Sequence, residues 1–294
     1  MTKRYEQHLH TVLAHTTFLK KVFFRSETIE YDLLLEKISR GYQTLKTQAL
    51  DDTDLVGSLQ LLFCNYLDHV WRAEFPPDKQ LDTEEIIIQL TDNDRDPTEF
   101  LEDQHVKLAS RVASKIKNLF TAAQQVFGSD FHTYCDEQFS PDLAKRIHIT
   151  LANGIIEDGG LYREKQVQAS QSKVVYAPPE TIEARMNVLF QFANQKAAEC
   201  ANLDPIQRTK EMFLVATVFL SEFLLIHPFS NGNGRTARLL LSFFLRDVTV
   251  VPFSLNHYIS ALEERNGGTP PSVLATLMLL SADQTHDIMD YLFK

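Results

Sequence analysis

One twelve-residue segment, residues 227–238, holds the side chains best suited to chemistry in this chain of 294 residues. It opens with His227 and closes with Arg235 and Arg238, with two glycines between them. Histidine has an ordinary pKa of about 6.5, which suits proton removal at neutral pH. Planar guanidinium groups match phosphate oxygens with paired hydrogen bonds. The segment therefore predicts a site for a phosphorylated ligand beside a general base.

The chain on its N-terminal side predicts a helix that presents the histidine. Asp204 is a favoured N-cap residue and Pro205 suits the first helical position, so the helix begins there. Its last stretch, to Ile226, is almost wholly apolar but only about 14 residues long and interrupted by polar residues, too short and too polar to span a bilayer, so we expect a buried core helix. Pro228 disfavours helical backbone at the residue before it, which places His227 at the edge of the core.

The two glycines predict a loop that binds an anion. Gly232 and Gly234 lack a Cβ, so they can adopt positive φ and let successive N–H groups converge. The chain re-enters helix near Arg235, where free amides and the helix dipole favour a phosphate. Arg235 and Arg238 are three residues apart and share one helix face. Each feature alone also fits an ordinary turn between two helices, but their combination at this spacing favours the anion site.

The segment resembles the signature of the Fic family, His-Pro-Phe-x-(Asp/Glu/Asn)-Gly-Asn-Gly-Arg-x-x-Arg, and matches it at every fixed position. The resemblance implies transfer of AMP from ATP to a Ser, Thr or Tyr hydroxyl of a target protein. It implies that His227 is the general base, that the amides of residues 232–234 and the side chain of Asn233 hold the inner phosphates, and that Arg235 and Arg238 bind the outer ones. It also implies Mg²⁺ or Mn²⁺ as cofactor, and an all-α, Fic-type helical bundle with a small β-hairpin flap.

The metal position of the signature is Asn231 in this chain. Active relatives most often carry Asp or Glu there, although Asn also occurs, and a neutral amide oxygen is the weaker ligand for a hard cation. A non-catalytic nucleotide sensor or adaptor therefore stays open. A second alternative, which unusual residues on the adenine side suggest, is a transferase that uses another donor, such as a different nucleoside triphosphate or CDP-choline.

A second stretch, residues 159–163, resembles the family's Gly-x-Tyr-Arg segment. Residues 166–170 and 173–176 alternate or carry β-branched side chains around a Gln-Ser turn, which predicts a short hairpin. In Fic enzymes the hairpin edge takes the target polypeptide by strand addition. The resemblance implies this docking role for Lys173, Val174, Val175 and Tyr176. A hairpin that only covers the core is the alternative.

A weaker match concerns the adenine pocket. Relatives carry an aromatic pair and then an Asn near the base, which implies that Tyr258 and Asn266 line this pocket. Ile259 stands where relatives often have a second tyrosine, so the pocket is expected to differ. An Asn before two glycines is also ordinary helix-ending chemistry.

Residues 26–30 resemble the family's inhibitory helix motif, Ser/Thr-x-x-x-Glu-Gly/Asn. The resemblance implies that Glu30, preceded by Ser26, pairs with Arg238 and occupies donors that ATP needs. Tyr31 departs from the motif, and a rival match ends at Glu102. Otherwise Ser26 is an N-cap and Glu30 a surface residue. Some relatives use the glutamate to remove AMP, so the reverse reaction is open as well.

Composition limits the other function classes. The net charge of −10, without a basic cluster, argues against a protein that follows nucleic-acid backbones. Any basic site is local, and Arg163 is expected to join Arg235 and Arg238 in one. Three widely spaced cysteines predict free thiols in a reducing compartment. The N-terminus carries no secretion signal or membrane anchor, so we expect a cytoplasmic protein without a membrane partner.

The chain is long and apolar enough to bury a substantial core by helix-on-helix packing. A polar linker before Pro97 predicts an N-terminal helical region, residues 1–97, that could carry the inhibitory helix, and a Fic domain with C-terminal helices, residues 98–294. A monomer and a homodimer are both open. Periodicity predicts helices over 5–25, 27–47, 54–73, 83–90, 98–126, 140–153, 180–198, 205–226, 235–247, 254–265, 271–281 and 284–292.

Overall fold

The computed structural model describes residues 2–22, 25, 27–47, 62–63, 65–66, 97–103, 109–128, 135–167, 174–251, 255, 261–262 and 269–292. Among these residues the regular structure is helical, with an isolated bridge between Val22 and Arg25, a further bridge residue at Val175 and no sheet. The predicted all-α class is confirmed. The predicted flap hairpin is not shown, because its turn and Lys173 lie outside the described residues and the described flanks form no strand.

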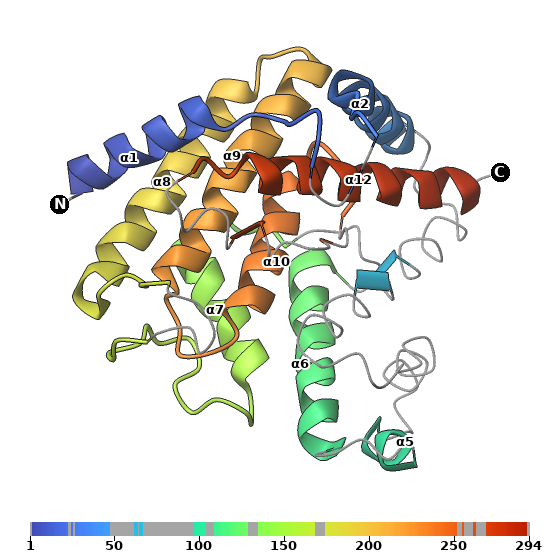
Figure 1. Cartoon of the computed structure of the whole chain (residues 1–294). Coiled ribbons are helices and arrows are strands. Elements are labelled where there is room, and N and C mark those ends of the chain that lie inside the picture. The colour runs from blue at the N-terminus through green and yellow to red at the C-terminus, as the bar shows by residue number, and fades with distance from the viewer. Residues whose placement is uncertain are drawn as a thin grey trace.

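The helices pack against one another in a bundle (Figure 1). Their bounds are α1 Thr2–His15, α2 Tyr31–Thr47, α5 Pro97–Asp103, α6 Ala109–Phe127, α7 Pro141–Ala152, the 3₁₀ turn η1 Pro179–Thr181, α8 Ile182–Cys200, α9 Pro205–Ile226, α10 Asn233–Leu245 and α12 Ser272–Leu292.

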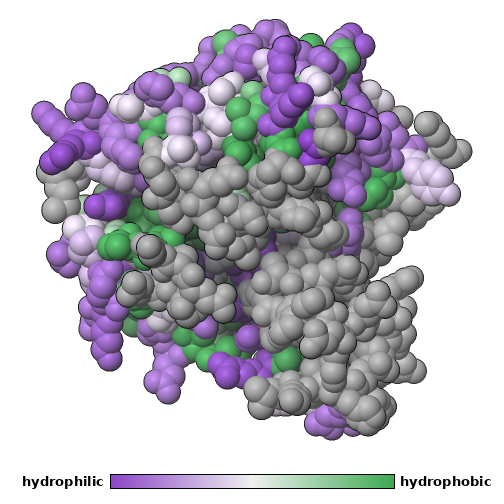
Figure 2. All heavy atoms as spheres, viewed as in Figure 1, coloured by the Kyte–Doolittle hydropathy of each residue, from purple (hydrophilic) through white to green (hydrophobic). Residues whose placement is uncertain are grey.

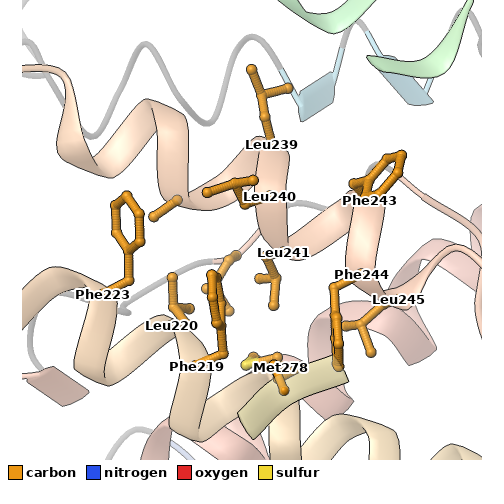
Figure 3. Packing of buried hydrophobic residues seen from close by; sticks show 14 of the residues in the cluster. Phe219, Leu220, Phe223, Leu239, Leu240, Leu241, Phe243, Phe244, Leu245 and Met278 are labelled. Atoms are coloured by element: carbon orange, nitrogen blue, oxygen red, sulfur yellow. The ribbon is translucent and has the colours of Figure 1, made fainter. Parts of the chain in front are cut away.

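Helix α9 is the central element of the bundle. It packs against α1, α2, α8, α10 and α12, and every residue from Met212 to Phe223 is buried. Phenylalanine and leucine side chains from α9 and α10 interlock around Met278 of α12 (Figure 3). The buried hydroxyls of this stretch donate to the helix itself: Thr217 Oγ1 to the Phe213 carbonyl at 2.7 Å and Ser221 Oγ to the Val218 carbonyl at 3.0 Å. The prediction of a buried core helix is confirmed.

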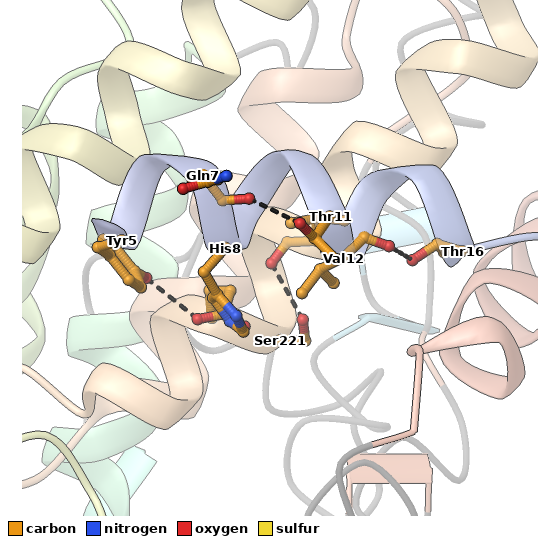
Figure 4. A network of polar contacts seen from close by, with 9 residues as sticks. Tyr5, Gln7, His8, Thr11, Val12, Thr16 and Ser221 are labelled. Carbon is orange, nitrogen blue, oxygen red and sulfur yellow. Dashed lines mark hydrogen bonds and ion pairs between the residues drawn. The ribbon is translucent and has the colours of Figure 1, made fainter. Parts of the chain in front are cut away.

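The N-terminal helices pack on this same core. From α1, Tyr5 Oη donates to Glu222 Oε2 of α9, and His8 Nε2 contacts Glu222 Oε1, both at 3.1 Å (Figure 4). From α2, Lys37 Nζ donates to Asp283 and Asp287 of α12 at 2.7 and 2.6 Å. Core residues thus lie on both sides of position 97, and the division of the chain there stays a prediction.

Several of the predicted helices differ from the structure, and the first of these, 27–47, begins only at Tyr31. The predicted helix 5–25 is shorter in the structure, because the N–H groups of Thr17 and Leu19 donate to Ser272 and Thr276 of α12 instead of continuing α1. The predicted helices 271–281 and 284–292 are one continuous helix, α12, since neither Gly nor Pro interrupts them.

The described surface is mostly polar. On the face shown in Figure 2, hydrophilic side chains dominate and hydrophobic ones are visible in separate patches. None of the described helices is both long enough and apolar enough to cross a membrane. Cys135 and Cys200 are free, as predicted, while Cys64 lies outside the described residues.

Candidate functional site

The candidate site is the loop between α9 and α10, residues 227–232, which we call the α9–α10 loop. His227 caps α9 through its N–H, which donates to the Phe223 carbonyl at 2.9 Å. Its backbone is left-handed, with φ 51° and ψ 62°, and it is the only non-glycine residue with positive φ in the described part of the chain. Such backbone costs an L-residue about 1–2 kcal/mol, so surrounding contacts must hold it.

Arg163 supplies these contacts. Its Nε donates to the His227 carbonyl at 2.7 Å, and its Nη2 to the Ile226 carbonyl at 3.2 Å and the Ala177 carbonyl at 2.5 Å. Its Nη1 donates to the Lys165 carbonyl at 2.8 Å. The prediction that Arg163 joins Arg235 and Arg238 in a phosphate-binding cluster is therefore wrong, because four of its five N–H donors already bind backbone carbonyls.

A histidine from α7 supports the other side of the loop. The ring of His148 stacks on that of Phe229 at 3.9 Å with an interplanar angle of 4°. Its Nδ1 accepts from the Gly160 N–H at 2.8 Å, so its Nε2 carries the proton and donates to the Asn231 carbonyl at 2.9 Å. Burial lowers the pKa of His148; the hydrogen bond to Asn231 and the charge of Asp158 oppose this shift, and the Arg235 charge adds to it. The imidazole is thus held neutral as a donor and an acceptor at once.

Asn233 closes the loop from within. Its Oδ1 accepts from the Phe229 N–H at 3.0 Å, and its Nδ2 donates to the Phe229 carbonyl at 2.8 Å. The side chain is 2% exposed. The sequence implied that this side chain binds phosphate, whereas in the structure it forms hydrogen bonds that hold the loop together. The Asn233 side chain is therefore occupied, but its backbone N–H is available to bind an anion. This N–H and that of Gly234 lie in the first turn of α10, where a helix offers no acceptor for them.

The two glycines have different roles. Gly232 is left-handed, with φ 76°, and a Cβ there would lie 3.4 Å from the His148 ring. Its carbonyl accepts from the N–H and Oγ1 of Thr236 at 3.0 and 3.1 Å, which starts α10. Gly234 lies inside α10 and does not have the positive φ that the sequence allowed.

The two signature arginines lie in the first two turns of α10. Arg235 and Arg238 are 3% and 5% exposed, and their spacing places them on one face of the helix. Arg235 Nη2 would lie 3.8 Å from a Cβ at Gly232, so its guanidinium reaches back to the loop. The structure thus brings both arginines to the same helix end as the unpaired amides.

Asn231 lies exposed at the tip of the loop. Its Oδ1 accepts from the Gly232 N–H at 2.7 Å. The adjacent Ser230 Oγ donates to Asp158 at 2.7 Å, which ties the loop to the turn after α7. Within the described ranges, no cluster of three or more His, Cys, Asp or Glu side chains has the geometry of a metal site.

The imidazole of His227 is partly buried under Tyr176. The two rings stack at 4.0 Å with an interplanar angle of 20°. Burial lowers the pKa of His227 to about 4; the charge of Arg163 adds to this, and a hydrogen bond to the Leu224 backbone opposes it. The ring is therefore neutral at pH 7 and able to accept a proton. Of the predicted flap residues, Val174 and Tyr176 are described beside a highly exposed Val175.

Of the four remaining predicted site residues, the structure describes only Glu30. Glu30 is exposed just before α2, and the described residues show no hydrogen bond or ion pair between it and Arg238. Ser26, Tyr258 and Asn266 lie outside the described residues. Inhibition by Glu30 and an adenine pocket at Tyr258 and Asn266 stay predictions.

Sequence reasoning missed two residues that organise the loop. His148 lies 83 residues before the carbonyl that it binds, and no local pattern marks it. Arg163 had a local signal, the Gly-x-Tyr-Arg segment, but its charge suggested a phosphate ligand. Its actual partners are the carbonyls at the end of α9.

Comparison with known proteins identifies the family of this loop and its helices. Residues 138–245 match the profile of the Fic/DOC family. A Fido domain-containing protein of Dictyostelium discoideum is 38% identical over 92 residues, which are 31% of this chain and 57% of that protein. Protein adenylyltransferase fic-1 of Caenorhabditis elegans is 29% identical over 110 residues, 37% of this chain and 20% of that protein.

A similar segment occurs in a ribonucleoside-diphosphate reductase small chain of Ostreid herpesvirus 1, 29% identical over 122 residues, 40% of this chain and 21% of the viral protein. The chain thus spans between about a fifth and somewhat over half of the length of these relatives. Because the similarity is confined to a segment, it supports the family assignment of that segment and says nothing of the activity of each whole relative.

Solved structures extend the likeness to the fold of most of the chain. A Fic domain-containing signalling protein from Bacteroides thetaiotaomicron superposes with a TM-score of 0.59 at 17% identity, over 88% of this chain and 98% of that one. A Fic family protein from Desulfovibrio desulfuricans gives 0.60 at 16% identity, over 90% and 75% of the two chains. At these identities the likeness shows the fold alone.

Proposed function

Since residues 138–245 belong to the Fic/DOC family, we propose that this protein transfers AMP from ATP to a Ser, Thr or Tyr hydroxyl of a target protein. The observation that carries the proposal is the α9–α10 loop, where a neutral imidazole meets unpaired amides and two arginines. The relative named protein adenylyltransferase fic-1 supports the choice of AMP as the group transferred.

In this proposal His227 is the general base. Its neutral imidazole accepts the proton of the acceptor hydroxyl while that oxygen attacks the α-phosphorus of ATP. The new oxygen–phosphorus bond forms as the bond to the β-phosphate oxygen breaks, and pyrophosphate leaves. His227 then returns its proton to solvent. General bases of this kind contribute about 10²–10⁴-fold in rate.

The start of α10 would bind the phosphates. The N–H groups of Asn233 and Gly234 point out of the first helical turn, where the helix dipole also favours negative charge. Arg235 and Arg238 add planar guanidinium groups on one face of the same turn and the next. Such fixed donors stabilise the charge that develops in phosphoryl transfer, for which positioning and electrostatics are the main contributions.

A divalent cation fits this loop only with help from the nucleotide. Asn231 offers one neutral oxygen, and that oxygen already accepts from the Gly232 N–H. Magnesium sites of this type take several ligands from substrate phosphates and water, which a single protein oxygen can complete. In our proposal Asn231 is that ligand for Mg²⁺ or Mn²⁺, and the bound ion would neutralise charge on the phosphates.

The neutral side chain at position 231 also favours a second candidate, a nucleotide sensor or adaptor that binds without turnover. This protein would use the same amides and arginines but would show no covalent transfer. A transferase with another donor, a different nucleoside triphosphate or CDP-choline, is separated from both by competition among nucleotides for binding.

Intact-mass spectrometry of the purified protein tests the proposal without knowledge of the target. The protein is incubated with ATP and Mg²⁺ or Mn²⁺, and a self-attached AMP is sought. We expect an adduct in the wild type that falls by about 10²–10⁴-fold in rate in His227→Ala. His15→Ala, at the exposed end of α1, is the matched control and should modify itself at the wild-type rate.

The same experiment tests the inhibitory motif. If Glu30 blocks the outer phosphate seat, Glu30→Gly should raise the yield of adduct and abolish any removal of AMP. No adduct in the wild type or in Glu30→Gly with either metal, while calorimetry still shows ATP binding, would contradict transfer of AMP and support the sensor.

A further inference from the structure

We propose that Arg163 is the positioning residue of His227: it fixes the left-handed backbone from which the imidazole acts, and it couples that backbone to the segment that carries Tyr176. This inference rests on the proposed role of His227 as the base. Arg163 itself is not expected to touch the nucleotide.

The first support is that Arg163 binds three successive carbonyls at the end of α9. Its side chain binds those of Ile226 and His227, at 3.2 and 2.7 Å, and its own backbone N–H donates to that of Pro228 at 2.9 Å. These are the peptide groups whose orientation changes when α9 gives way to left-handed backbone at His227. Holding all three from one residue fixes the turn, and with it the direction of the imidazole.

The second support is that the same guanidinium binds the segment on the other side of the imidazole. It donates to the carbonyls of Lys165 and Ala177 at 2.8 and 2.5 Å. The Ala177 N–H in turn donates to the Leu225 carbonyl at 3.2 Å. Tyr176, next in the chain to Ala177, stacks on the His227 ring. Arg163 therefore sets both the backbone of the base and the aromatic ring that covers it.

The third support is the chemistry of the site. Arg163 is 4% exposed, and every hydrogen-bond partner named here is a neutral carbonyl. A buried cation without a carboxylate is unfavourable for folding alone. The positive charge of Arg163 instead acts on His227: it lies beside the imidazole and opposes its protonation. Among the described residues, the other groups recorded against this ring are the Tyr176 phenol and the Leu224 backbone.

Only arginine combines these properties. Its planar fork presents five donors at fixed angles, whereas lysine presents a compact ammonium with three. Arg163→Lys therefore keeps the charge and loses the geometry, and Arg163→Gln loses the charge and most of the donors. The two variants separate positioning from electrostatics.

The test is NMR of His227 in the full-length protein, with its signals assigned through His227→Ala. In the wild type the Cα shift should report left-handed backbone, and the imidazole should titrate at about 4. Arg163→Gln should move the pKa of His227 toward its ordinary value of about 6.5 and alter the Cα shift. Arg163→Lys should alter the Cα shift while leaving the pKa low. Both should lower kcat by about 10²-fold with little change in KM for ATP.

Arg246→Gln is the matched control. Arg246 is partly buried and donates to the Phe243 carbonyl at 2.6 Å, at the opposite end of α10. It should leave the His227 pKa, Cα shift and kcat unchanged. Wild-type His227 signals in both Arg163 variants, or an equal change in Arg246→Gln, would overturn the proposal. If Arg163→Gln does not fold, Arg163→Lys decides through its Cα shift. The NMR result stands even where no transfer is detected, so the two proposals can fail separately.

Discussion

At the residue scale, position 231 offers a direct test of metal use. We expect Asn231→Asp to bind Mn²⁺ about tenfold more tightly in the presence of a non-hydrolysable ATP analogue, a gain of about 1.4 kcal/mol. The reason is that a carboxylate is a stronger ligand for a hard cation and can still accept from the Gly232 N–H. Electron paramagnetic resonance of free Mn²⁺ measures the affinity.

Asn153→Asp is the control for this measurement, because it adds the same charge at an exposed position after α7. It should leave the Mn²⁺ affinity as in the wild type. Equal affinity in Asn231→Asp and the wild type would show that the cation is held by phosphates alone.

The residues that sequence reasoning could and could not identify differ in how they make contact. His227, Arg235 and Arg238 lie within one short segment, where spacing along a helix and a turn is enough to predict proximity. His148 and Arg163 reach the loop from 83 and 64 residues away along the chain. Their contacts depend on how α7 and the segment after it pack against α9, which no local pattern encodes.

At the element scale, α7 acts as a support for the α9–α10 loop through His148. We expect His148→Phe to destabilise the protein by about 2–4 kcal/mol. Phenylalanine can keep the stacking on Phe229, but it leaves the buried Gly160 N–H without its partner, at about 1–3 kcal/mol, and it removes the partly buried hydrogen bond to the Asn231 carbonyl, at about 1 kcal/mol. Urea unfolding followed by circular dichroism measures the change.

Ile149→Ala, on the exposed face of the same helix, should change stability by less than about 0.5 kcal/mol. A His148→Phe protein as stable as this control would mean that water replaces both hydrogen bonds, and α7 would then not be a support for the loop.

Helix boundaries were predictable where the chain carries its own stop signals. The predicted span 205–226 coincides with α9, because Asp204 caps its start by accepting from two N–H groups at 3.1 Å and Pro228 prevents its continuation. The end of α1 carries no such signal. It is set by hydrogen bonds from Thr17 and Leu19 to α12, more than 250 residues later in the sequence.

At the scale of the whole molecule, the family match covers little more than a third of the chain, yet the bundle extends well beyond it. Helix α1 binds Glu222 of α9 through Tyr5 and His8, five residues before His227. The sequence did not predict this contact, because the linker before Pro97 indicated that the first 97 residues form a separate region. The packing instead makes α1 part of the surroundings of the central helix.

The bundle also buries several imidazoles that titrate below their ordinary range. Burial lowers the pKa of His286, a residue of α12 whose ring packs against Gly41 of α2, to about 4, and it lowers that of His227 to the same value. His286 contacts Thr249 Oγ1 through Nε2 at 3.2 Å and leaves no room for a Cβ at Gly41. His227 lies at the end of α9 and His286 inside α12, so protonation of either ring should destabilise the fold at a different place.

The free energy of unfolding should therefore fall as the pH is lowered from about 6.5 to about 4. In this window the unfolded chain binds protons on both histidines while the folded protein does not, and each contributes a slope of about 1.4 kcal/mol per pH unit. Above pH 6.5 both states are neutral and the contribution is constant.

His286→Gln removes one titrating ring, so its slope between pH 6 and 5 should be smaller than the wild-type slope by about 1.4 kcal/mol per pH unit. His15→Gln, at an exposed position, should keep the wild-type slope. Urea unfolding of the three proteins at pH 7, 6 and 5 measures these slopes, and equal slopes in His286→Gln and the wild type would show that the buried ring does not resist protonation.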